Sequence, residues 1–188
     1  SASDDSGLGS SVMDFGEDWN TTEVPNATLA AAGAFSLNWS AMEMGLDFLA
    51  GVIWHQYGGK TLEDENPKAL ARKITFLRKA CKRLDSIRSA SQVIESLMTR
   101  IDELTETRHR LIHGAVLGVP QDDTLRLVRL IHDKRGFHTG EEVTLTREEL
   151  DHGAAFAQAI AHRLLTLAFV LEAEGPNFRK NARGEVSV

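Results

Sequence analysis

Residues 91–115 read SQVIESLMTRIDELTETRHRLIHGA, and this stretch decides both the fold class and the search for a site. Apolar residues recur in it every three or four positions, which is the spacing of one face of an α-helix. The members of this stripe are Ile94, Leu97, Ile101, Leu104, Leu111 and Ala115. Arg108 occupies a position of the stripe where the pattern calls for a core residue. Because an unpaired guanidinium is costly to bury, Arg108 must either line a cleft or meet a counter-charge.

Three further stretches have helical spacing and indicate a helical bundle. One starts at about Ser36, one follows Pro67, and one follows Thr146. Together with the stretch above, they predict a mainly α protein, an up-and-down bundle of four to five helices joined by short connections. The helix that contains Arg108 is expected to run on toward Gly118.

A β-hairpin is predicted between the third and fourth long helices, at about residues 124–145. Residues 124–132 are aliphatic, short and bounded by turn residues, and residues 142–145 supply the second strand. Thr146 and Glu149 have the spacing of a capping box, which starts the last helix.

The domain organisation follows from length and charge. A chain of 188 residues is long enough for one well-packed core. Residues 1–33 contain six carboxylates and no Lys or Arg, and they are predicted to form a flexible acidic arm. Residues 34–175 are predicted to form a single helical domain. Gly175 and Pro176 are expected to end its last helix, leaving residues 176–188 as a flexible tail.

Cysteine content and hydropathy patterning predict a cytoplasmic protein without membrane contact. Cys81 is the one cysteine, which excludes an intrachain disulfide and favours a reducing compartment. No signal peptide is recognisable, and polar residues interrupt the first apolar run. The net charge of -6 conceals a basic stretch, residues 68–88, in which eight Lys and Arg accompany Asp85 alone. The basic side chains of this stretch either form a solvated surface or bind along an RNA backbone.

The run from Arg108 to His113 supports two kinds of chemistry. His109 and His113 are four residues apart and share a helix face, whereas Arg108 and His113 are about 140° apart. A pair of histidines at this spacing can bind a metal, but Arg108 and Arg110 would repel a cation and no Glu stands between them. No metal and no cofactor are therefore predicted.

Phosphodiester chemistry fits the same residues better. An arginine can hold two phosphate oxygens and stabilise the added charge of a pentacovalent transition state. A histidine can take a proton from a ribose 2′-hydroxyl or give one to the leaving oxygen. Attack by a neighbouring hydroxyl needs no metal, so RNA is the implied substrate. One histidine cannot easily act as both the general base and the general acid. A homodimer with a twofold pair of sites is therefore expected, because it would supply two histidines.

The run Arg108-His109-Arg110-Leu111-Ile112-His113 resembles the R-x4-6-H signature of HEPN domains, the higher eukaryote and prokaryote nucleotide-binding family. The resemblance implies a four- or five-helix bundle whose motif lies at a homodimer cleft. It also implies a metal-independent endoribonuclease of a toxin-antitoxin, abortive-infection or phage-defence system, with an antitoxin or a nucleotidyltransferase-like protein as partner. Arg108 and His113 would then be the catalytic pair, and His109 would occupy the polar position after the arginine.

Two other interpretations stay open at this point. In one, Arg108 pairs with Glu43 or Asp47 of the first helix and His113 joins a buried polar network. In the other, the protein is a non-catalytic dimeric module that holds a nucleotide, an RNA or a partner protein. Cys81 lies on an apolar stripe and is predicted to be a core residue.

Overall fold

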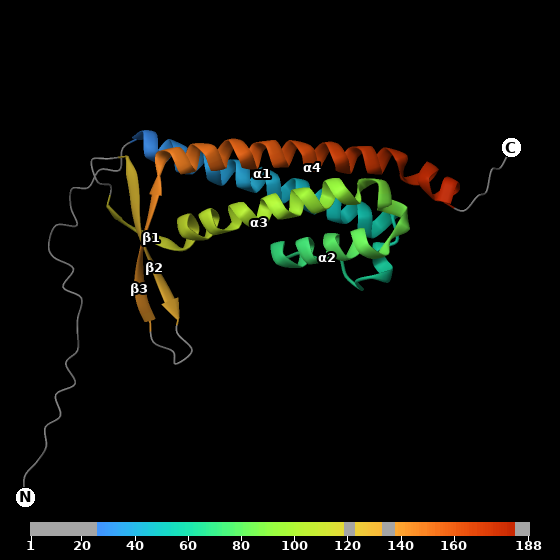
Figure 1. The fold of residues 1–188 in the computed structure, drawn as a ribbon, viewed down its shortest axis with the longest axis horizontal. Coiled ribbons are helices and arrows are strands. Elements are labelled where there is room, and N and C mark those ends of the chain that lie inside the picture. The colour runs from blue at the N-terminus through green and yellow to red at the C-terminus, as the bar shows by residue number, and fades with distance from the viewer. Residues whose placement is uncertain (1–25, 119–122, 133–137, 183–188) are drawn as a thin grey trace, which may run out of the picture.

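The computed structural model describes residues 26–118, 123–132 and 138–182. Four α-helices, two short 3-10 helices and one small sheet make up these residues, and Figure 1 shows the sheet at one end of the helices. The elements in chain order are α1 (Asn26–Gln56), η1 (Gly59–Thr61), α2 (Leu70–Arg83), η2 (Asp85–Ala90), α3 (Ser91–His113), β1 (Gly114–Gly118), β2 (Thr124–His132), β3 (His138–Thr146) and α4 (Arg147–Ala182). The mainly α fold predicted from the sequence is confirmed.

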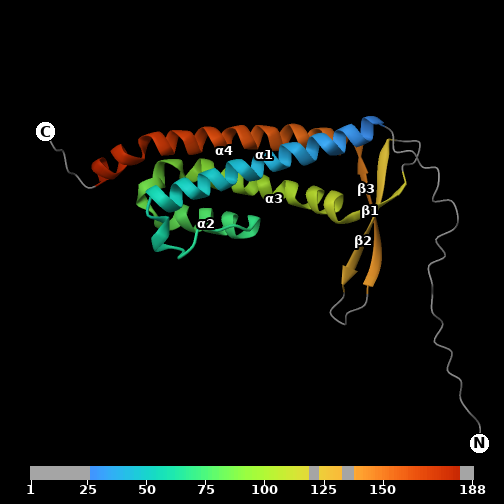
Figure 2. The same ribbon diagram turned by 180° about the vertical axis from the view of Figure 1, so that it is seen from behind.

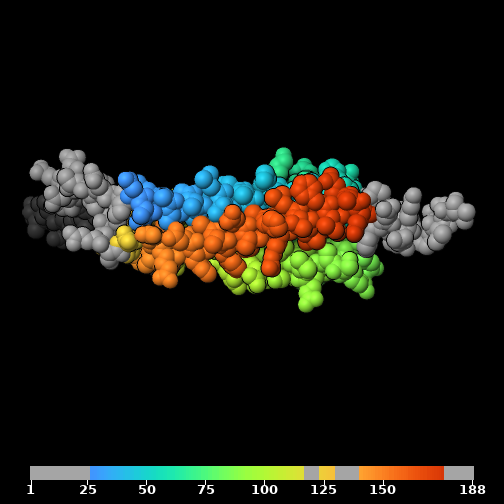
Figure 3. Space-filling model, turned by 90° about the horizontal axis from the view of Figure 1, so that it is seen from above, coloured from blue at the N-terminus to red at the C-terminus, as the bar shows by residue number. Residues whose placement is uncertain are grey.

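α1 and α4 form the long axis of the molecule and run parallel to each other. The Asn38 side chain donates a hydrogen bond to the carbonyl of Ala154 (3.0 Å), and the Tyr57 hydroxyl donates one to the carbonyl of Leu171 (2.5 Å). Between these bonds, a Cβ on Gly45 would lie 3.0 Å from the Cβ of Leu164, so glycine lets the helices approach closely. Figure 3 shows the two helices side by side along one face.

α2 packs along α1 and α3 packs along α4, so that α2 and α3 form a second layer beneath the first pair, as seen in Figure 2. They are antiparallel. Arg78 of α2 contacts Asp102 in the middle of α3 (2.8 Å), whereas Cys81, nearer the end of α2, contacts Ser91 at the start of α3 (3.8 Å). The apolar stripe of α3 fills the space between the helices as predicted, and its buried members are Ile94, Leu97, Ile101 and Leu104. The stripe of α3 therefore forms part of the core of this chain.

The up-and-down order is wrong at the first connection. Residues 57–69 carry the chain back along α1, so that α2 runs in the same direction as α1. Gly58 makes the reversal feasible, because its φ of +90° is a left-handed conformation that favours glycine. The loop is then held by the indole of Trp54, which donates to the carbonyl of Glu63 (3.0 Å).

The expected hairpin is part of a three-stranded antiparallel sheet with the order β1-β2-β3. α3 does not continue to Gly118 but ends at His113, and β1 follows at once. Gly114 takes extended backbone angles and pairs with Arg129 of β2. A Cβ there would lie 2.7 Å from both the Arg110 carbonyl oxygen and the Leu127 Cβ, so glycine permits this abrupt change from helix to strand.

Alternation along the strands attaches the sheet to the helices. Leu125, Leu127 and Leu145 are buried, while Arg126, between the first two, is exposed and pairs with Glu142 of β3. The capping box that starts α4 is confirmed. The Thr146 amide donates to the Glu149 carboxylate (2.7 Å), and the Glu149 amide donates to the Thr146 hydroxyl (3.1 Å).

Both ends of the helical region lie farther out than predicted. α1 begins at Asn26, so residues 26–33, expected in the arm, are helical, because alanines dominate this turn and Thr28 and Ala31 are buried. α4 continues through Gly175 and Pro176 to Ala182, although a proline within a helix removes a backbone donor and its ring crowds the carbonyl four residues earlier. Residues 1–25 and 183–188 of the expected arm and tail lie outside the described residues.

α4 has a second notable property. Its segment Arg147–Gly175 is long and apolar enough to cross a membrane, as the core helices of soluble proteins can be. In this chain α4 packs along α1 through a row of buried residues, Leu150, Ala154, Ala157, Ala161, Leu164, Ala168 and Leu171. The absence of membrane contact stays a prediction.

Candidate functional site

A hollow of about 380 Å³ lies beside Arg108, where the start of α2 passes the end of α3. α1 contributes Glu43 to its wall. The residues from α2 and α3 are Leu70, Ala71, Ile74, Thr75, Arg78, Asp102, Thr105, Arg108 and His109. The hollow thus joins an apolar side, from α2, to a polar side that contains two residues of the Arg-His run.

Arg108 reaches this hollow without a counter-charge. The central carbon of its guanidinium lies 5.8 Å from the centre of the Trp39 ring, within cation–π range. Its Nε is buried and has no hydrogen-bond acceptor among the described residues. No carboxylate of these residues lies within 4.0 Å of it, and Asp47 is paired with Lys73 instead. The ion pair of Arg108 with Glu43 or Asp47, one of the two interpretations left open by the sequence, is therefore not formed.

His109 and His113 are brought together as the helical spacing predicts. Their rings are stacked, with centres 5.5 Å apart and planes 24° from parallel. His109 is half-buried and lines the hollow, whereas His113 is exposed. His113 therefore does not belong to a buried polar network. Arg108 and His109 share the hollow, whereas His113 does not line it and contacts only the ring of His109 among the aromatic rings described.

The surroundings of the two histidines are basic where the structure describes them. Among the residues that the structure describes, no group of three or more His, Cys, Asp or Glu side chains could hold a metal ion. Arg108 is the neighbour of His109 in the hollow, and a guanidinium beside the ring opposes cation binding.

The basic stretch of residues 68–88 is largely neutralised by ion pairs. Asp47, Glu63, Asp85, Glu95 and Asp102 supply its counter-charges. The basic residues with such a partner are Arg72, Lys73, Arg78, Lys79 and Arg88. Most of this stretch is therefore engaged within the fold, which favours a solvated, paired face over a track for an RNA backbone.

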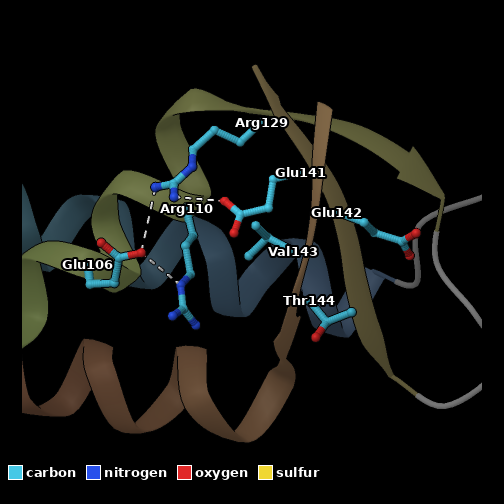
Figure 4. A pocket seen from close by; sticks show the side chains of 7 residues that line it. All are labelled: Glu106, Arg110, Arg129, Glu141, Glu142, Val143 and Thr144. Atoms are coloured by element: carbon cyan, nitrogen blue, oxygen red, sulfur yellow. Dashed lines mark hydrogen bonds and ion pairs between the residues drawn. The ribbon is translucent and has the colours of Figure 1, made fainter. Parts of the chain in front are cut away.

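A second hollow, of about 250 Å³, lies where the sheet meets the last turns of α3 (Figure 4). Arg129 of β2 bridges Glu106 of α3 (3.6 Å) and Glu141 of β3 (2.8 Å). Glu106 also accepts a hydrogen bond from Arg110 (3.2 Å). This ion-pair cluster fixes the sheet against the turn of α3 from Glu106 to Arg110, which contains Arg108 and His109. The sequence did not reveal it, because its members come from three separate elements.

Cys81, predicted to be a core residue, is only partly buried against the core, and its environment still suppresses reactivity. Desolvation by burial, with a smaller effect of the Glu95 charge, raises the pKa of its thiol from 9.0 to about 11. Because of this higher pKa, the thiolate fraction at pH 8 is roughly 100-fold smaller than that of an unperturbed thiol. Only the thiolate attacks electrophiles, so the rate of alkylation falls by the same factor. We expect iodoacetamide to label the folded protein about 100-fold more slowly than the urea-unfolded chain. Equal rates would contradict the partial burial of Cys81.

Sequence reasoning identified Arg108, His109 and His113 but missed the wall that faces them. Trp39 has the helical spacing of a core residue and is indeed buried, yet its ring also supports the Arg108 guanidinium. The arrangement can hold an anion at Arg108 and can move a proton through His109 or His113. Comparison with family models, with curated proteins and with solved structures found no match to this chain.

Proposed function

We propose that this protein is a HEPN-like, metal-independent endoribonuclease that acts as a homodimer. One observation carries the proposal: the Arg108 guanidinium lies at an open hollow beside His109 without a carboxylate partner among the described residues. A charged group with unused donors is suited to a phosphodiester, which offers acceptor oxygens in the geometry that a guanidinium prefers.

The chemistry can be written with these side chains alone. Arg108 binds the non-bridging oxygens of the scissile phosphate and stabilises the charge that develops on them. A histidine removes the proton of the ribose 2′-hydroxyl, whose oxygen forms a bond to phosphorus. The bond from phosphorus to the 5′-oxygen breaks, and that oxygen takes a proton from a second histidine. The products are a 2′,3′-cyclic phosphate and a 5′-hydroxyl end.

Exposed apolar side chains beside the site support the pairing of two copies. Ile112 is 51% exposed, lies one helical turn beyond Arg108 and precedes His113. Val116, at the start of the sheet, is 48% exposed. Such residues favour burial against a partner surface, and a second copy would bring a second pair of histidines. A cytoplasmic toxin-antitoxin or phage-defence role, with an antitoxin or nucleotidyltransferase-like partner, is part of the proposal.

A second function is favoured by the position of His113. Because His113 is exposed and does not line the hollow that contains Arg108, the site can bind a nucleotide without cleaving RNA. The alternative proposal is a non-catalytic dimeric module for a nucleotide, an RNA or a partner protein.

Cleavage assays in EDTA separate the two functions. We expect the wild-type chain to cleave mixed single-stranded RNAs at the same rate with and without EDTA. His109→Ala and His113→Ala should each reduce the cleavage rate by about 100-fold or more. His162→Ala is the matched control, since His162 is exposed on α4.

The two functions predict different outcomes of this assay. The absence of cleavage by any variant, together with protection of the protein by nucleotides, would support the binding module. Equal cleavage by wild type and by both histidine variants would remove the catalytic assignment.

A further inference from the structure

We infer that the hollow beside Arg108 also holds a nucleobase, and that Glu43 makes it selective for guanine. The inference rests on the proposed function, because it places the phosphate of the same nucleotide at Arg108. The volume of the hollow, about 380 Å³, falls within the range of about 300–1,000 Å³ typical of small-molecule sites.

The two sides of the hollow differ in the way that a nucleotide requires. Leu70, Ala71 and Ile74 of α2 provide an apolar wall against which the flat face of a base can lie. Arg108 and His109 lie on the α3 side, where a phosphate would find its donors. A nucleotide bound here would therefore place its base toward α2 and α1.

Most polar side chains of the hollow already have partners. Arg78 is paired with Asp102 (2.8 Å). Thr75 and Thr105 donate to carbonyls of their own helices (both 2.8 Å). Glu43 differs, because it makes no hydrogen bond and no ion pair within the described part of the chain, although it is half-buried. Glu43 is therefore the free acceptor on the base side of the hollow.

A free carboxylate selects among the bases by its two acceptor oxygens. Guanine presents two adjacent donors, N1–H and N2–H, on one edge, and a carboxylate can accept both. On the corresponding edges, adenine and cytosine place an acceptor beside their amino group, and uracil offers a single N–H between two carbonyls. Phosphate is repelled by Glu43 and attracted by Arg108, so charge also fixes the direction in which the nucleotide binds.

Calorimetric titration of the full chain with GMP, AMP, CMP and UMP tests this inference without any cleavage step. We expect GMP to bind at least 10-fold more tightly than the other three. Glu43→Gln replaces one acceptor oxygen by an NH2 donor, so it should weaken GMP binding at least 10-fold and leave AMP binding within about 2-fold. Glu103→Gln is the control, since Glu103 is exposed on α3 outside the hollow.

The outcomes separate this inference from the proposed ribonuclease. Equal affinities for the four nucleotides, or an unchanged GMP affinity in Glu43→Gln, would overturn guanine selection even if RNA is cleaved. A GMP preference that depends on Glu43, in a protein that cleaves no RNA, would support guanine selection and remove only the catalytic proposal. Circular dichroism of each variant verifies that it is folded.

Discussion

Replacing Arg108 by alanine is expected to slow RNA cleavage by at least about 100-fold, the scale on which single transition-state donors act. Arg108→Lys is expected to recover only a small part of this loss, because an ammonium keeps the charge but not the planar pair of donors. Initial rates at saturating RNA measure both variants. Arg83→Ala is the matched control, since Arg83 is exposed and has no ion pair within the described residues.

The salt dependence of the same variants adds a second readout. The measured quantity is the slope of the logarithm of RNA affinity against the logarithm of salt concentration. Arg108→Ala should lower this slope by the amount expected for the loss of about one phosphate contact, whereas Arg83→Ala should leave it unchanged. A loss of activity as large in Arg83→Ala as in Arg108→Ala would show that general positive charge, and not the hollow, governs the reaction.

Leu46→Ala is expected to lower the free energy of unfolding by about 3–5 kcal/mol, the largest effect on stability that we predict. Leu46 is fully buried at the centre of α1, where α1 packs against the other helices. Truncating its side chain removes apolar contacts and leaves a cavity that close packing cannot refill. Urea denaturation followed by circular dichroism measures the change.

Leu29→Ala provides the same chemical change at an exposed position of the same helix. It should alter the free energy of unfolding by less than about 0.5 kcal/mol. If the two variants are destabilised equally, the orientation of α1 about its axis is not the one described here.

Helical periodicity predicted the helices well because a buried stripe must repeat with the turn of the helix. The stripe around Ile101 is buried as expected, and α4 begins at the predicted capping box. The capping box is a local signal, since Thr146 and Glu149 satisfy each other's backbone amides within one turn. Such features can be read from a single segment of sequence.

The direction of α2 and the third strand depend on contacts between distant segments. The sequence of residues 57–69 does not indicate that the chain returns along α1. The direction of α2 depends on contacts between separate helices, such as the ion pair of Lys73 with Asp47. Likewise, residues 114–118 follow a helical stripe without interruption. They become a strand because β2 offers a free edge, where Val116 pairs with Leu127.

The candidate site shows the same division. Arg108 was identifiable as a cation within an apolar stripe, and His109 and His113 by their spacing on one helix face. Glu43 and Trp39 became part of the site only through the packing of α1 against α3. Apolar spacing explains why Trp39 is buried, but it cannot show that a guanidinium lies over the ring.

The side-chain NMR signal of Arg108 tests the central claim most directly. Its Nε–H is buried without an acceptor among the described residues, and Arg108→Lys identifies the resonance by its disappearance. A 2′-O-methyl RNA dinucleotide cannot be cleaved, because its 2′-oxygen carries no proton, and it serves as the probe. On titration with this probe, we predict that the Arg108 Nε–H signal shifts and saturates together with the backbone signal of His109. An unchanged Arg108 signal, while signals elsewhere in the protein shift on binding, would contradict the account.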